Sequence, residues 1–415
     1  MQERVFVTGI GILCAIGKNA GETLESLMAG RTGIGAITQF DTLHRGVLPL
    51  AEVKMTTEEL LEATGNSGSR RFTRTALLGM IAAAEAMKSA GITDAGDCPT
   101  GLISATTVGG MDRSERFYAK FLENPSGGRL IDIVNHDCGD STERIAGYVG
   151  IRDFVTTVST ACSSSVNALM MGSNLIRTGQ LERVVVGGTD SVTRFTLNGF
   201  NTLMILDKTG CHPFDDNRAG LTLGEGAAFL VLESESRVRK EHKKVLAEVK
   251  GYGNANDAYH QTASSPDGTG AFLAMSKALE MSGIKPEEID YINAHGTGTQ
   301  NNDLSEGIAL QRIFGDRVPP FSSTKGFTGH TLGAAGAVEA VISVLALLNQ
   351  VRFPNPGFTT PMKELTIRPI IADDLRKDHP AGSRFHTPVR NVLSNSFGFG
   401  GNNSTVILSL TSNLS

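Results

Sequence analysis

The sequence predicts an α/β fold with largely parallel strands, arranged as two similar halves. Short apolar or β-branched runs alternate with longer runs that have helical spacing, which is the pattern of strands connected by helices. The 415 residues include 48 glycines but only five tyrosines and no tryptophan, which favours tight turns and closely packed backbone. The same pattern begins again near residue 246, and this repetition predicts the second half.

In the first half, each predicted strand is a short apolar run, and each predicted helix repeats its apolar residues at helical spacing. Strands are expected at residues 4–11, 100–110, 153–159 and 182–188. Helices are expected at residues 21–30 and 74–91, and after Cys162, ending at Thr178. The last strand is continuously apolar, which is typical of a strand buried on both faces.

The second half repeats this alternation. Strands are expected at residues 246–257 and 289–296, and helices at residues 270–283 and 333–348. A polar, basic stretch at residues 233–244 separates the two patterns. We therefore expect a division of the chain into residues 1–245 and 246–415.

The composition is that of an ordinary soluble, cytoplasmic protein. A net charge of -5 with 20% charged residues provides no strong field for nucleic acid or a membrane. The five cysteines are scattered without a C-x-x-C pair, which indicates a reducing compartment and no zinc site. The apolar N-terminus is broken by glycines and is expected to form a buried strand rather than a targeting segment. No run is expected to approach the length needed to span a bilayer.

Cys162 lies in "STACSSS", at the junction between a predicted strand and a predicted helix. The first N–H groups of a helix have no internal partner, and the helix dipole is positive at that end. Both effects favour a thiolate, so this position suits a reactive cysteine. The alternative at this point is a small buried hydrophobic residue, which is how most unpaired cysteines behave.

Five further candidates lie in glycine-rich loops or in an apolar helix of the second half. His295 follows a predicted strand, and Lys325 and His330 share the loop "STKGFTGH". Glu339 is a lone carboxylate in an apolar helix, where it is costly unless it faces a polar partner. Phe399 lies in "NSFGFGG", a loop that can offer backbone N–H donors. A structural histidine remains the alternative for His295 taken alone.

These residues together carry a resemblance to a known family. The motifs are "TACSSS", "PFDDNRAGLTLGEGAA" at residues 213–228, "NAHGTGT", "STKGFTGHTLGAAGAVE" and "NSFGFGGNN". In this order and spacing the chain resembles the elongating β-ketoacyl-acyl carrier protein synthases of the thiolase superfamily, from residue 3 to residue 409. The resemblance implies a thiolase-like fold, with two pseudo-symmetric βαβαβ halves in a layered α-β-α-β-α core.

The resemblance also implies a reaction and the groups that perform it. Cys162 would accept an acyl chain from a carrier-protein thioester, and His295 and His330 would promote decarboxylation of malonyl carrier protein before a Claisen condensation. Lys325 would support the site electrostatically. No metal and no tightly bound cofactor are expected, because the substrates arrive on the 4′-phosphopantetheine of the carrier protein.

The remaining residues implied by the resemblance surround these groups. The backbone N–H groups of Cys162 and Phe399 would hold the oxyanion, and Phe399 could also act as a gate. Other expected roles are support by Glu339, Asp303 and Glu306, binding of the phosphopantetheine arm by Thr297 and Thr299, and an acyl pocket near Val108, Met111, Asn198, Phe200 and Phe399.

The chain departs from the common family pattern at two places. Ala219 stands where relatives commonly carry an acidic residue, and Cys211 and His212 replace a more usual basic residue. A specialised aryl polyene or polyketide pathway is therefore an alternative to fatty-acid elongation. A non-catalytic chain-length-factor subunit would lack the nucleophile, and a cysteine hydrolase would show a G-x-C-x-G turn and one histidine with an acidic partner.

The resemblance implies two macromolecular partners. The first is an acidic acyl carrier protein, so a local cluster of Lys and Arg is expected near the pocket mouth. The second is another copy of the chain, joined along an edge strand, with residues 129–137 near the partner's pocket. A heterodimer with a chain-length-factor subunit is the alternative.

Overall fold

The computed structural model describes residues 3–377 and 388–411. In the first half the elements are β1 (Val5–Cys14), α1 (Ala20–Met28), β2 (Ile34–Gly35), β3 (Leu50–Ala51), α2 (Thr57–Ala63), α3 (Arg74–Ser89), β4 (Thr100–Ala105), α4 (Met111–Glu123), α5 (Cys138–Val149), β5 (Phe154–Val158), α6 (Ser164–Arg177), β6 (Arg183–Asp190), α7 (Arg194–Thr202), β7 (Gly226–Ser234) and α8 (Glu235–Lys240). In the second half they are β8 (Ala247–Asn256), α9 (Thr269–Ser282), β9 (Tyr291–Asn293), α10 (Gln300–Phe314), β10 (Phe321–Ser322), α11 (Lys325–Thr328), α12 (Ala335–Asn349), α13 (Ala372–Lys377), β11 (Asn391–Gly398) and β12 (Asn402–Ser409).

Ten strands form one sheet in the order β10-β9-β11-β12-β8-β1-β7-β6-β4-β5. Leaving aside the short pair β2 and β3, both halves have the same order, in which the third strand of the half is outermost and the first is innermost. The two innermost strands, β1 and β8, pair only at Phe6 with Glu248 and at Val7 with Ala247. The structure therefore contains two sets of five strands with equal topology.

The prediction of largely parallel strands was wrong. The pairs β4–β5, β4–β6, β9–β10 and β9–β11 are parallel, whereas β1–β7, β6–β7, β11–β12, β8–β12 and β1–β8 are antiparallel. The reason is that β7 and β12 end each half by returning between two earlier strands. β12 follows β11 through the short turn Phe399–Gly401, which leaves no room for the crossover that a parallel pair requires.

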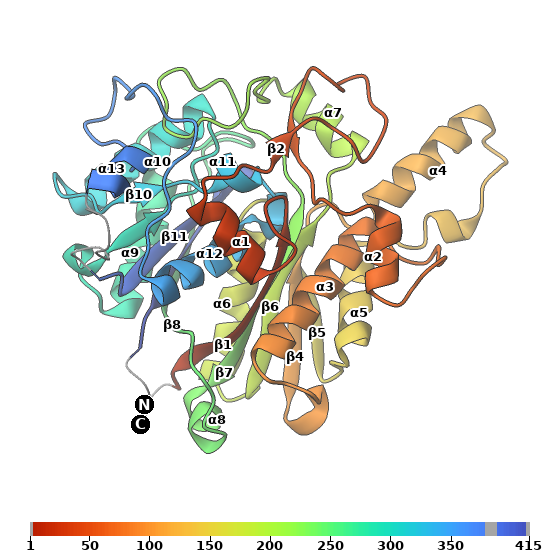
Figure 1. Cartoon of the computed structure of the whole chain (residues 1–415), viewed down its shortest axis with the longest axis horizontal. Coiled ribbons are helices and arrows are strands. Elements are labelled where there is room, and N and C mark those ends of the chain that lie inside the picture. The colour runs from red at the N-terminus through yellow and green to blue at the C-terminus, as the bar shows by residue number, and fades with distance from the viewer. Residues whose placement is uncertain (1–2, 378–387, 412–415) are drawn as a thin grey trace.

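Helices lie in three layers, so the fold is the expected α-β-α-β-α arrangement (Figure 1). Helices α6 and α12 lie between the two sets of strands, α3 and α5 cover the first set, and α9 and α10 cover the second. Successive side chains of β6 point to opposite faces of the sheet, so one strand contributes to two apolar layers. Val184 and Val186 belong to the central apolar cluster, and Val185 belongs to the outer one.

The predicted helices and strands are otherwise confirmed, with boundaries that differ by a few residues. The polar stretch at residues 233–244 ends β7 and forms α8, and Glu233 and Arg237 in it are buried in an ion pair. The division of the chain at residue 246 stays a prediction, and its second part extends over residues outside the described ones. The helical run Leu332–Asn349 is long and apolar enough to cross a membrane, contrary to expectation, but 89% of it is buried inside the protein. It is a core helix.

Candidate active site

Cys162 lies in the turn that connects β5 to α6. Ala161 has φ 55, a left-handed conformation that is uncommon for a residue with a side chain, and it reverses the chain just before the cysteine. The hydroxyl group of Ser164 fastens this turn, because it accepts from the N–H of Thr160 and donates to the carbonyl of Ala161. The thiol is only 7% exposed and faces the cavity described below.

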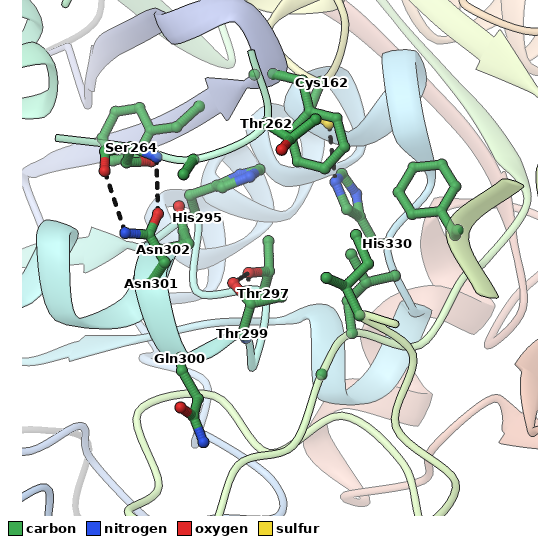
Figure 2. Close-up of a pocket in the computed structure, with 18 of the residues that line it drawn as sticks. Cys162, Thr262, Ser264, His295, Thr297, Thr299, Gln300, Asn301, Asn302 and His330 are labelled. Atoms are coloured by element: carbon green, nitrogen blue, oxygen red, sulfur yellow. Dashed lines mark hydrogen bonds between the residues drawn. The ribbon is translucent and has the colours of Figure 1, made fainter. Parts of the chain in front are cut away.

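His330 is the direct partner of this thiol. Its Nε2 lies 3.0 Å from the Cys162 sulfur (Figure 2). Burial raises the pKa of Cys162 to about 12, against the lowering effects of Lys325 and the Phe399 N–H. Burial, and then Lys325, hold the pKa of His330 well below its usual value. Burial therefore opposes the thiolate that the helix start favours, and in the free enzyme the two pKa shifts favour a thiol beside a neutral imidazole.

The two histidines differ in what holds their second ring nitrogen. The Nδ1 of His330 is buried, and among the described residues it has no hydrogen-bond partner. The Nδ1 of His295 lies 3.1 Å from the Nζ of Lys325. An ammonium group only donates, so Nδ1 of His295 accepts and its proton is on Nε2. His295 is thus a fixed N–H donor, whereas the protonation of His330 is free to change.

Lys325 links His295 to a buried carboxylate. Its Nζ also donates to the carbonyl of His295 at 2.6 Å and forms an ion pair with Glu339, which lies in α12. Burial raises the pKa of Glu339 to about 7, against the opposing effect of Lys325. Burial, Lys325 and His330 together hold the pKa of His295 well below its usual value, so this ring is neutral. The rings of His295 and His330 are edge to face, with centroids 5.3 Å apart.

Two carboxylates of α10 order the loop that carries His295. Glu306 accepts from the N–H groups of His295 and Gly296, at 2.9 and 2.8 Å. Asp303 accepts from the N–H groups of Thr297 and Gly298. Both carboxylates are buried and neither lines the cavity at the sulfur, which fits the expected role of ordering this loop.

The Phe399 turn closes the other side of the site. The backbone N–H of Phe399 faces the Cys162 thiol and lowers its pKa, against the effect of burial. Gly398 allows this approach, since a Cβ there would lie 3.0 Å from the Thr160 oxygen and 3.1 Å from the Cys162 nitrogen. The Phe399 ring stacks on Phe200, with centroids 5.9 Å apart. An N–H donor and an aromatic ring therefore meet at the nucleophile.

A cavity of about 410 Å³ opens onto these groups. Of the sequence-predicted residues, it is lined by Cys162, Phe200, His295, Thr297, Thr299, His330 and Phe399. Val108 and Met111 do not line it. They belong to an apolar cluster made mostly of leucines, against which Phe200 also packs. Their role in holding an acyl chain stays a prediction. Asn198 bonds to His44 at a separate surface hollow.

Sequence reasoning missed one wall of this cavity. This wall is formed by Thr262, Ser264, Gln300, Asn301 and Asn302. It lies beside Thr297 and Thr299, whose hydroxyl groups are 2.9 Å apart (Figure 2). The three consecutive amide residues in "TQNND" could have identified this wall from the sequence, because three neighbouring amide side chains at a helix start are unusual for a purely apolar cavity.

The departures from the family pattern also lie near this cavity. Ala219 lines it. Cys211 is buried and donates to the carbonyl of Thr297 at 3.3 Å, and His212 contacts the carbonyl of Gly357. Both departures therefore lie at the cavity or at the loop that carries Thr297 and Thr299 (the threonine loop), rather than at the Cys162 sulfur.

Ligand atoms of Cys162, His295 and His330 lie within 4.8 Å of one another, a set of residue types that binds transition metals elsewhere. The Lys325 ammonium, in contact with His295, opposes a second cation at this position. The arrangement is better suited to moving a proton at the sulfur and donating a hydrogen bond to a developing negative charge.

Comparison with known proteins gives consistent results. Residues 2–238 match the family described as "Beta-ketoacyl synthase, N-terminal domain", and residues 246–359 match the corresponding C-terminal domain. The chain is 32% identical to a 3-oxoacyl-[acyl-carrier-protein] synthase 2 of Staphylococcus aureus, with 98% of each chain covered. Among solved structures, it resembles the ishigamide ketosynthase/chain length factor (TM-score 0.90, 30% identity, covering 99% and 100%) and a ketosynthase in complex with its chain length factor from Xenorhabdus doucetiae (TM-score 0.78, 31% identity, covering 99% and 98%).

Proposed function

Because the chain belongs to the β-ketoacyl synthase family, it is a condensing acyltransferase, a β-ketoacyl-acyl carrier protein synthase, and we propose that Cys162, His295 and His330 perform its two half-reactions. One observation carries this assignment. A buried thiol lies 3.0 Å from a histidine whose protonation can change, beside a second histidine fixed by Lys325 as a donor.

In the first half-reaction the Cys162 sulfur attacks the carbonyl carbon of the acyl thioester. A carbon–sulfur bond forms while the thiol proton passes to Nε2 of His330. The tetrahedral oxyanion accepts from the N–H groups of Cys162 and Phe399. The bond to the carrier sulfur then breaks, and this sulfur takes the proton back from His330. One thioester replaces another, so no external energy source is needed.

In the second half-reaction a malonyl thioester loses carbon dioxide. The electron pair of the broken carbon–carbon bond moves into an enolate, whose oxygen accepts from Nε2–H of His295 and, once the neutral ring has moved its proton from the unpartnered Nδ1 to Nε2, from His330. The enolate carbon attacks the acyl group on Cys162, and the carbon–sulfur bond breaks. The released thiolate takes one proton from solvent through His330, so one proton is consumed for each carbon dioxide released.

Substrates reach this site on an acyl carrier protein, and we place the docking surface at a basic groove. The groove has a volume of about 860 Å³ and is lined by Arg70, Arg113, Arg116, Lys120 and Arg129, together with four acidic residues. Arg129 pairs with one of these acids. Within the residues that the structure describes, Arg70, Arg116 and Lys120 form no ion pair, so they are available to an acidic partner.

The oligomer that we propose is a homodimer joined at β5. This strand is at the edge of the sheet, and all five of its residues are only half buried. Helix α4 projects from the body and has no buried residue (Figure 1). Exposed apolar side chains cover this region, among them Tyr118, Leu122 and Leu130 at 59%, 65% and 76%. Such a surface is typical of an interface.

A ketosynthase of a specialised polyene or polyketide pathway is a second candidate. The structural likeness to ketosynthases that are described with a chain length factor favours it. A molar mass of twice 43.9 kDa for the purified chain supports the homodimer, and a monomer that dimerises only with a second subunit supports the alternative. We further propose that the protein works in the cytoplasm and holds no cofactor tightly, since its own side chains supply every step above.

The function is tested by supplying acyl and malonyl carrier proteins and weighing the carrier-bound product. Wild-type protein is expected to form β-ketoacyl carrier protein and carbon dioxide, and Cys162→Ala to form no product. Cys211→Ala is the matched control, because Cys211 is equally buried and also has its pKa raised to about 12. Equal product from the Cys162→Ala variant would overturn the assignment.

A further inference from the structure

The side chain of Asn301 holds a loop that the reaction itself does not explain. Asn301 lies in the first turn of α10, immediately after the threonine loop. Its Oδ1 accepts from the N–H of Ser264 at 2.7 Å, and its Nδ2 donates to the carbonyl of the same residue at 3.1 Å (Figure 2). One amide therefore satisfies both backbone groups of one residue, as a neighbouring strand would.

The loop held in this way, residues 257–268, connects β8 to α9 and forms one wall of the cavity. Its segment from Thr262 to Ser264 faces the same cavity as Thr297 and Thr299. The hydroxyl of Ser305 donates to the carbonyl of Ser265 at 2.8 Å, which gives a second attachment to α10. The loop is thus fixed to α10 just beyond the segment that lines the cavity.

The same loop is attached at its other end to the Phe399 turn. The N–H of Gly400 donates to the carbonyl of Gln261 at 2.8 Å. Asn256, at the end of β8, donates to the carbonyl of Gly400 at 2.8 Å. The loop therefore spans the mouth of the cavity, from the helix after Thr299 to the turn that carries the Phe399 N–H.

From this geometry we infer that Asn301 is a positioning residue, which holds the Thr262–Ser264 wall at the width required by the phosphopantetheine arm. This inference rests on the proposed function. Asn301 itself lines the cavity, but both the Oδ1 and the Nδ2 of its amide are bonded to Ser264, so it acts on the arm through Ser264. Because the loop keeps its attachments at Gln261 and Ser265 without Asn301, the fold is retained and the wall loosens.

The test compares Asn301→Ala with wild type on three measurements. KM for acyl carrier protein is expected to rise about tenfold with kcat within about twofold, and hydrogen exchange of residues 261–265 is expected to accelerate. The rate with an acyl N-acetylcysteamine thioester, which lacks the outer part of the arm, is expected to stay unchanged. Alkylation of Cys162 by iodoacetamide, which needs no arm, is expected to stay unchanged as well.

Gln311→Ala is the matched control, since it removes an amide bonded to Thr366 at 2.6 Å on the same helix, away from the loop. Asn301→Asp should fall between wild type and Asn301→Ala, because a carboxylate still accepts from the Ser264 N–H but cannot donate to the Ser264 carbonyl. An unchanged KM for acyl carrier protein would overturn the inference. A raised KM with unchanged hydrogen exchange of residues 261–265 would also overturn it, because Asn301 would then contact the arm directly. Equal losses with the carrier-bound and the truncated substrate would also overturn it. Failure of the wild-type protein to condense would instead overturn the proposed function, so the two failures are distinct.

Discussion

Replacing His295 by alanine separates the two half-reactions. The ring supplies one fixed donor, Nε2–H, because its Nδ1 accepts from Lys325. Lys325 keeps its bonds to the residue 295 carbonyl and to Glu339 in the variant, so the surrounding charges stay in place. A preorganised donor to a developing oxyanion contributes about 2.7–4 kcal/mol, which predicts a loss of about 10²–10³ in decarboxylation. Acyl transfer uses Cys162, His330 and the Phe399 N–H, and is expected to change by about threefold or less.

Two mass measurements on the same sample follow these steps. The intact mass of the enzyme reports acylation of Cys162, and the mass of the carrier arm reports the conversion of malonyl to decarboxylated product. His295→Asn is the matched variant, because its amide can still donate, and it should recover part of the decarboxylation rate. Equal losses in acylation and decarboxylation would refute separate roles for the two histidines. Decarboxylation at the wild-type rate would refute the role of His295 altogether.

Three further predictions test the electrostatics and the docking surface. Burial raises the pKa of Cys162 to about 12, so the thiolate fraction grows with pH over the whole accessible range. Alkylation by iodoacetamide should therefore accelerate about tenfold per pH unit from pH 7 to 10. A plateau below pH 8 would show a stabilised thiolate and contradict this prediction. Glu339→Ala leaves the Lys325 ammonium buried without its carboxylate partner. Urea titrations should show that the free energy of unfolding falls by about 3–5 kcal/mol. A loss below about 1 kcal/mol would contradict a tight buried pair. Arg116→Glu should raise KM for acyl carrier protein and weaken its dependence on salt, without changing the rate with an acyl N-acetylcysteamine thioester; the same KM as wild type would place docking elsewhere.

Much of the site could be predicted from the sequence because its chemistry lies in loops with distinctive residue types. Cys162, His295, Lys325 and His330 each follow a strand or lie among glycines, and the structure brings all four together. Glu339 was expected to need a polar partner because a carboxylate in an apolar helix is otherwise costly, and Lys325 is that partner. Local residue type was sufficient in these cases.

Features that depend on long-range packing could not be predicted in the same way. The antiparallel return of β7 and β12 is set by which strands they enter between, and no short pattern records this. The raised pKa of Cys162 follows from burial by segments more than a hundred residues away, which opposes the local effect of the helix start. The bond of Asn301 to Ser264 joins residues 37 positions apart, so neither stretch identifies it alone.

The most direct test of the account is the site of the acyl group. After incubation with acyl carrier protein alone, the enzyme should gain the mass of one acyl chain per protomer, and peptide mapping should place it on Cys162 within residues 159–169. The Cys211→Ala variant should gain the same mass, and Cys162→Ala should gain none. An acyl adduct that persists in the Cys162→Ala protein would contradict the account.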